Sequence, residues 1–145
     1  MVKVQDNEIF DILTGRVSGV INRSLLRAFA AQGVDITPEQ WSVLACLWKK
    51  DKITQQALCD LTRKDKPSMT RLIDNLERHH LVVRVSDASD RRINLIHLTE
   101  SGAAMQDKTT RIVQGVVDKA LNGITDAELT LSREVLLRIM KNLDS

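Results

Sequence analysis

The chain has 145 residues, 43% of them hydrophobic and 28% charged, which is typical of one folded domain and excludes a disordered segment. The longest apolar run, Val43–Trp48, is too short to span a bilayer, and the N-terminal segment has no apolar stretch like that of a signal peptide, so we expect a cytoplasmic protein. The formal net charge is only +2, which does not by itself indicate a nucleic-acid partner, and two cysteines exclude a disulfide framework.

The charge is unevenly distributed along the chain. Lys49–Leu98 contains eleven Lys and Arg against seven Asp and Glu, whereas the rest of the chain is slightly acidic. This asymmetry weakly favours polyanion binding by the middle of the chain. An ordinary solvated surface explains so small an excess equally well.

The first three predicted elements are helices. Apolar residues recur every three or four positions over Glu8–Ala31, which predicts one long helix. A second helix, Pro38–Lys49, begins at a Thr37/Gln40 capping box. A short third helix, Gln55–Leu61, is predicted to direct its leucines inward, with Leu61 among them.

The fourth predicted helix runs from about Lys66 to His79, after a polar break of four residues. Pro67 suits its first turn, where a missing N–H has no cost. Its apolar face consists of Met69, Leu72, Ile73 and Leu76, and its outer face of Ser68, Thr70, Arg71, Asp74, Asn75 and Arg78.

After the fourth predicted helix, the spacing of apolar residues changes from a helical pattern to that of extended strands. Leu81–Val85 and Ile93–Leu98 are predicted to be the two strands of a hairpin. The first is rich in β-branched residues, and in the second successive side chains alternate between the two faces of a strand. The connecting turn carries Asp90-Arg91-Arg92 at its tip. A fifth helix capped by Thr99 is predicted to reach Asn122, and a sixth begins at a capping box that opens with Thr125.

This order of elements predicts a mainly α fold with a winged helix-turn-helix. The third helix, the polar break and the fourth helix form the helix-turn-helix, and the hairpin forms the wing. A helix fits the DNA major groove, and a short turn with two guanidinium groups suits a narrow minor groove. Helix-turn-helix geometry also occurs in proteins that bind no DNA, so the pattern leaves an interaction module open.

The wing carries the motif of a known family. The run Asp90–Gly102 resembles the wing signature of the MarR family of bacterial regulators, D-x-R-x-x-x-hydrophobic-x-L-T-x-x-G. The segments Leu58–Leu61 and Pro67–Glu77 look like the third and recognition helices of that family. The resemblance extends over the whole chain, with one departure: the family commonly has Gly after the recognition helix, where this chain has His79-His80.

The resemblance implies a homodimer that binds a pseudo-palindromic double-stranded DNA operator, most simply as a repressor. It implies a single domain, 1–145, with a winged DNA-binding region at 35–102 and a dimerisation region at 1–34 and 103–145. It also implies that Arg92 enters a minor groove and that Asp90 holds Arg92 in place. The residues predicted to bind DNA are Lys64, Lys66, Ser68, Thr70, Arg71, Asn75, Arg78, Asp90, Arg91 and Arg92.

Many members of that family release DNA when a small anionic aromatic ligand binds between the two regions. The candidates for such an effector pocket here are the scarce aromatic residues Phe29, Trp41 and Trp48. Arg16, Arg23 or Arg27 would be near enough to meet the anion. The same aromatic side chains fit an ordinary core equally well.

Other functions have little support in the sequence. No phosphate-binding glycine loop, zinc-protease motif or nucleophile elbow is present, so we expect neither an enzyme nor a cofactor. The adjacent histidines raise a metal or pH-sensing hypothesis, but no second cluster of ligands accompanies them. Cys46 and Cys59 are expected to be small buried residues rather than redox sensors.

Overall fold

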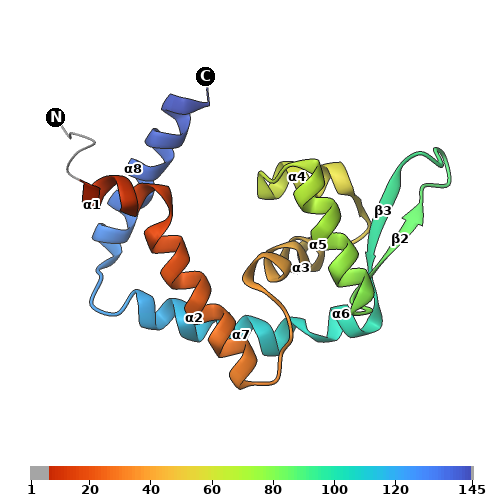
Figure 1. The fold of residues 1–145 in the computed structure, drawn as a ribbon, viewed down its shortest axis with the longest axis horizontal. Helices are drawn as coiled ribbons and strands as arrows, with labels where there is room; N and C mark the ends of the chain where they lie inside the picture. Colours follow the sequence, from red (N-terminus) through yellow and green to blue (C-terminus); the bar gives the residue numbers. More distant parts are fainter. Residues whose placement is uncertain (1–6, 145) are drawn as a thin grey trace.

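The computed structural model describes residues 7–144 and has the predicted mainly helical architecture with a small sheet at one end (Figure 1). None of the helices in that range is long and apolar enough to cross a membrane. The helical elements are α1 (Asn7–Asp11), η1 (a π-helical turn, Ile12–Arg16), α2 (Val17–Ala31), α3 (Pro38–Lys49), α4 (Gln55–Thr62), α5 (Lys66–Arg78), α6 (Glu100–Ala104), α7 (Gln106–Ala120) and α8 (Asp126–Leu143).

The sheet has three antiparallel strands in the order β1-β3-β2. The predicted hairpin is present as β2 (Val82–Ser86) and β3 (Asn94–Leu98), with Val82 opposite Leu98 and Ser86 opposite Asn94. The two-residue strand β1 (Ile53–Thr54) was not predicted; it pairs with the other edge of β3.

The hydrophobic core lies between α3, α4, α5 and the sheet. Its fully buried residues include Val43, Leu44, Leu47, Leu58, Met69, Ile73, Leu76, Val82 and Ile96. Phe29 of α2 and Ile112 of α7 reach this core from the two long helices, which pack against each other. The core therefore fixes α5 and the hairpin in one unit and attaches that unit to the α2–α7 pair (Figure 1).

Side-chain caps begin these helices where the sequence predicts them. Thr37 and Gln40 form the capping box of α3, and Thr125 forms the corresponding box of α8 with Glu128. Thr54 caps α4 and Thr99 caps α6. These caps satisfy backbone N–H groups that have no partner inside the helix.

Two predicted long helices are interrupted. The first departs from helical geometry at Gly15, where no Cβ restricts the backbone, so η1 separates α1 from α2. The fifth divides at Met105 into α6 and α7. At this second break the Gly102 carbonyl accepts a hydrogen bond from Trp48 Nε1 at 3.0 Å and one from the Met105 N–H at 3.4 Å.

The helices outside the winged unit leave much apolar surface uncovered. All 18 residues of α8 are exposed or half-buried. Large apolar side chains that remain exposed in α1, η1, α2 and α8 include Ile9, Phe10, Leu13, Val17, Val20, Leu131, Leu136 and Leu143. So large an apolar surface is typical of an interface.

Candidate nucleic-acid interface

The helix-turn-helix consists of α4, the turn at residues 63–65, and α5. Arg63 ends α4 in the left-handed conformation, with φ 56°, and Asp65 caps α5 by accepting the Ser68 N–H at 2.8 Å. Met69, Leu72, Ile73 and Leu76 bury one face of α5, as predicted. The opposite face of this helix is therefore held toward solvent.

Arg71 and Arg78 occupy that outward face, and Lys66 lies in the first turn of α5. Lys66, Arg71 and Arg78 are exposed, whereas Ser68 and Asn75 lie half-buried at its edge. These groups offer hydrogen-bond donors of the kind that bind phosphate oxygens and base edges.

Two helix-turn-helix residues that were predicted to bind DNA have partners within the protein. The Thr70 hydroxyl accepts a hydrogen bond from Gln55 Nε2 at 2.8 Å, so it faces α4. Lys64 Nζ lies 3.5 Å from Glu39 Oε2 of α3. Both side chains are therefore partly engaged within the protein.

The wing tip presents Arg92 to solvent on a turn that Asp90 organises. Asp90 Oδ1 accepts the backbone N–H of Arg92 at 3.0 Å and lies 3.3 Å from its side-chain Nε. The Arg92 side chain remains 91% exposed. The structure thus contains a contact between Asp90 and Arg92 and leaves the Arg92 guanidinium exposed to solvent.

Sequence reasoning missed Arg84, which joins the wing to α5. Its guanidinium lies 2.7 Å from Asp74 Oδ1 and 3.0 Å from Glu77 Oε1. The alternation of the strand places Arg84 on the same face as Val82, but it could not show the partners of Arg84, which lie in another element.

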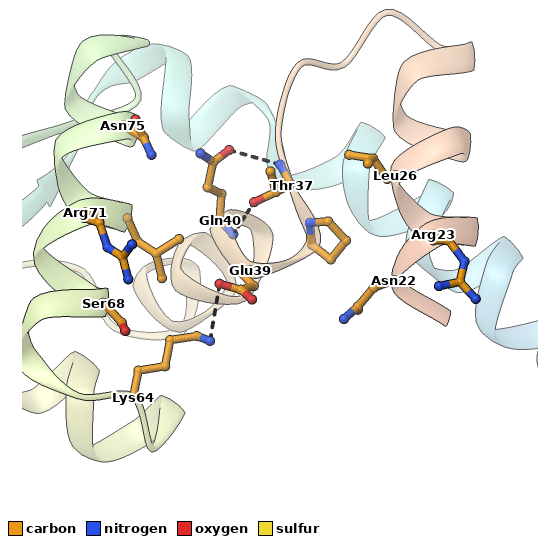
Figure 2. Close-up of a pocket in the computed structure, with 12 residues that line it drawn as sticks. Asn22, Arg23, Leu26, Thr37, Glu39, Gln40, Lys64, Ser68, Arg71 and Asn75 are labelled. Carbon is orange, nitrogen blue, oxygen red and sulfur yellow. Dashed lines mark hydrogen bonds and ion pairs between the residues drawn. The ribbon is translucent and has the colours of Figure 1, made fainter. Parts of the chain in front are cut away.

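A cavity of about 620 Å³ lies between α2, α3 and α5. Figure 2 shows Asn22 and Arg23 of α2 on one side and Ser68, Arg71 and Asn75 of α5 on the other. Together with Lys64, four residues predicted to bind DNA therefore also line this cavity. Arg23 is one of the cations that the sequence offered for an effector pocket, whereas Asn22 had no motif that would have identified it.

Phe29, Trp41, Trp48 and Arg16, which the sequence offered for an effector pocket, do not line this cavity. Phe29 is fully buried in the core. Trp41 and Trp48 pack edge to face, with ring centroids 6.0 Å apart, and their Nε1 atoms donate to Thr109 Oγ1 and the Gly102 carbonyl. Their N–H groups have partners within the protein and their half-buried rings pack against the core, whereas Arg16 belongs to η1.

The structure shows the surroundings of one of the adjacent histidines and of both cysteines. His79 Nδ1 donates to the Asn75 carbonyl at 2.8 Å, and within residues 7–144 no three His, Cys, Asp or Glu side chains are grouped to hold a metal. Cys59 is buried, and burial raises the pKa of the half-buried Cys46 thiol, which disfavours the reactive thiolate.

Comparisons with known proteins place this geometry among bacterial regulators. The model of the MarR family matches residues 36–93. The HTH-type transcriptional regulator YybA of Bacillus subtilis is 26% identical over 92% of this chain and 89% of its own length.

Two solved structures have the same fold over nearly the whole chain. CouR from Rhodococcus jostii RHA1, bound to p-coumaroyl-CoA, is 28% identical with a TM-score of 0.76, over 92% of both chains. The S. aureus MepR–DNA complex has a TM-score of 0.83 over 92% of this chain and 97% of MepR, at 24% identity.

Proposed function

The chain belongs to the MarR family of transcriptional regulators, and we propose that it acts as a homodimer that binds double-stranded DNA and represses transcription. We place it in the cytoplasm, where bacterial promoter DNA is accessible. In this proposal α5 enters the major groove and the β2–β3 wing enters the adjacent minor groove.

The wing geometry is the observation that carries the proposal. Arg92 is almost fully exposed, yet its backbone and side chain both contact Asp90. An exposed arginine that is already oriented loses less conformational freedom on binding than an unrestrained one. The narrow minor groove has a strongly negative potential and attracts such a side chain.

The exposed basic residues of α5 support major-groove binding. Arg71 and Arg78 lie opposite the buried face of the helix, and Lys66 lies in its first turn. We assign base and phosphate contacts to this surface, to Lys64, Ser68 and Asn75 at its edges, and to Arg91 beside Arg92. Thr70 is assigned a supporting position, because its hydroxyl is bonded to Gln55.

The uncovered apolar surfaces support a dimer. Residues 35–102 form the winged region in this proposal, and residues 1–34 and 103–145 form the dimerisation region. A two-fold axis would cover the exposed side chains of α1, α2 and α8 with the same surfaces of a second copy. It would also place two α5 helices about 34 Å apart, one turn of DNA, which matches a pseudo-palindromic operator.

The cavity beside α5 supports relief of repression by a small anionic aromatic ligand. Arg23 and Arg71 supply cations on opposite walls, and Leu26 and Leu72 supply apolar surface. CouR, a relative with the same fold, binds the aromatic thioester p-coumaroyl-CoA. A ligand in this cavity would contact residues that we assign to DNA binding.

A DNA titration tests the function. Fluorescence anisotropy of the DNA upstream of its own gene should show binding stronger than to scrambled DNA by about 10³-fold, with strong salt dependence.

Arg92→Ala should weaken binding by about 1–3 kcal/mol and leave the protein folded. Lys66→Ala should reduce the salt slope by about one, because one phosphate contact is lost.

Two results would contradict the proposal. Absence of binding to either DNA at low salt would exclude a DNA-binding regulator and favour an interaction module. Wild-type affinity in Arg92→Ala would show that the wing does not enter a groove.

A further inference from the structure

Arg84 lies on the inner face of the sheet, where a charged side chain is uncommon. It pairs with Ile96 across the β2–β3 ladder, and opposite residues of an antiparallel pair share a face. Ile96 is fully buried, as is Val82, two residues before Arg84 on the same face of the strand. The Arg84 side chain is accordingly only 20% exposed and is directed toward α5.

The guanidinium of Arg84 contacts three groups of α5. Nη2 lies 2.7 Å from Asp74 Oδ1 and donates to the Thr70 carbonyl at 3.4 Å, while Nη1 donates to Glu77 Oε1 at 3.0 Å. The backbone N–H of Arg84 donates to the other oxygen, Glu77 Oε2, at 3.1 Å. Glu77 thus binds both the main chain and the side chain of one strand residue.

The same network reaches α4. The Thr70 hydroxyl accepts from Gln55 Nε2 at 2.8 Å, so hydrogen bonds link the first turn of α4, the middle of α5 and the second strand. Charge-assisted hydrogen bonds of this kind fix orientation more strongly than neutral ones. The angle between wing and α5 is therefore held by specific bonds as well as by the core.

The two carboxylates also affect the electrostatics of α5. Asp74 and Glu77 lie on the same helix as Arg71 and Arg78, which we assign to DNA contacts. Unpaired, these carboxylates would repel a polyanion at close range. Arg84 neutralises them from within the protein and is too enclosed to serve mainly as a phosphate contact itself.

We propose that Arg84 is a positioning residue, which holds the wing at a fixed angle to α5 and neutralises Asp74 and Glu77, so that wing and helix enter neighbouring grooves together. This inference rests on the proposed DNA-binding function. It assigns to Arg84 an effect on operator binding that arises without contact to the DNA.

The test compares Arg84→Met with Arg92→Ala in the full-length protein. Arg84→Met should lower affinity for the upstream fragment by roughly tenfold, the scale of one charge-assisted hydrogen bond, and should lower affinity for scrambled DNA less, because a misplaced wing matters most where both grooves are bound specifically. Arg92→Ala should lower both affinity and slope, because it removes a direct contact. Arg84→Lys should recover part of the loss, because it keeps the charge but not the paired donors.

Two outcomes would overturn the inference. An equal loss of affinity on the upstream and the scrambled fragment in Arg84→Met would show that Arg84 acts through charge alone and does not position the wing. Wild-type affinity in a folded Arg84→Met protein would exclude any role. If Arg84→Met does not fold, Glu77→Gln replaces it, because that variant keeps the shape of the side chain and weakens the same clamp.

Hydrogen exchange in the free protein separates this inference from the function on which it rests. Arg84→Met should speed amide exchange in β2 and at the wing tip, residues 84–93, several-fold relative to wild type. Unchanged exchange would refute the clamp even if the protein binds DNA. Faster exchange in a protein whose wild type binds no DNA would uphold the clamp and refute the proposed function.

Discussion

Gly102 shows why the end of the wing motif requires a glycine. A Cβ at this position would lie 2.0 Å from the Leu81 carbonyl oxygen, which is too close for any side chain. The Thr99 hydroxyl accepts the Gly102 N–H and donates to the His80 carbonyl, and Trp48 donates to the Gly102 carbonyl. The T-x-x-G end of the motif therefore joins α3, α6 and the α5–β2 turn, and it does so without facing the proposed DNA surface.

Gly102→Ala should destabilise the protein by about 3 kcal/mol, because backbone must move to admit the methyl group. Gly115→Ala is the matched control, since no atom lies within 4 Å of its added Cβ and alanine favours a helix; it should stabilise by about 0.5–1 kcal/mol. Urea denaturation at one protein concentration measures both. Equal stability of the two variants would refute the close contact.

The adjacent histidines have opposite backbone requirements. His80 has φ 59°, in the left-handed region that glycine adopts freely, whereas His79 ends α5 with φ −85°. His80→Gly should therefore stabilise the protein by about 1 kcal/mol. His79→Gly should destabilise it by about 0.5–1 kcal/mol, because glycine loses more entropy there and the ring bond to Asn75 is lost.

Thermal unfolding of the two histidine variants checks this prediction. The sign of the difference is the decisive result, since both variants remove one imidazole. A destabilised His80→Gly would show that the His80 side chain contributes more than its backbone strain costs.

At the level of elements, the sequence predicted the features that depend on neighbouring residues, such as the starts of helices. Thr37, Thr54, Thr99 and Thr125 begin their helices as expected, because a cap involves residues three positions apart. The break at Met105 could not be predicted, because it accompanies a hydrogen bond from Trp48, 54 residues from Gly102. Strand β1 is two residues long and depends on β3, so its own sequence contains no period to detect.

The candidate site also has parts that local sequence patterns predict and parts that they do not. The helical spacing of apolar residues identified the outward face of α5, and the wing motif identified the wing tip. Period could not show that Thr70 bonds Gln55 or that Arg84 bonds Asp74, because both contacts join different elements. Leu61 was expected to be inward but is 65% exposed, because α4 buries Leu58 and Cys59 instead.

The N-cap of α5 makes one element sensitive to pH. The Ser68 N–H bonds the Asp65 carboxylate and holds its pKa below the usual 3.8. A depressed folded-state pKa stabilises the protein above the unfolded value, and the contribution is lost as pH falls through the folded value. Wild type should therefore be more stable than Asp65→Asn at pH 7, and the difference should disappear under acid.

Urea titrations at pH 7 and pH 3 measure that difference. Asp60→Asn is the control, because it removes a carboxylate from α4 that caps no helix. A difference between wild type and Asp65→Asn that stays constant over this range would show that the charge of Asp65 is irrelevant to the cap.

At the scale of the whole molecule, the chain contains two regions of different character. The winged unit buries its apolar residues in its own core, whereas α8 leaves its leucines uncovered. Arg63 and Asp144 form an ion pair between the turn before α5 and the end of α8, but both side chains are more than half exposed. Exposed ion pairs contribute about 0–1 kcal/mol, so this contact cannot replace the burial that α8 lacks.

A charge placed on the apolar side of α8 should therefore prevent dimerisation. Leu136 is 52% exposed and lies among the apolar residues of that helix, so Leu136→Asp would bury a carboxylate in the proposed interface. We expect the dimer dissociation constant to rise by at least about 100-fold. Thr130→Asp adds the same charge on the polar side of the helix and should leave the dimer intact. Sedimentation velocity over a range of protein concentrations measures the change.

Monomeric wild type at every concentration would leave the apolar surface of α8 without the partner that we propose. A dimeric Leu136→Asp protein would move the interface to another surface. Loss of operator binding together with loss of the dimer would link the spacing of the two α5 helices to recognition.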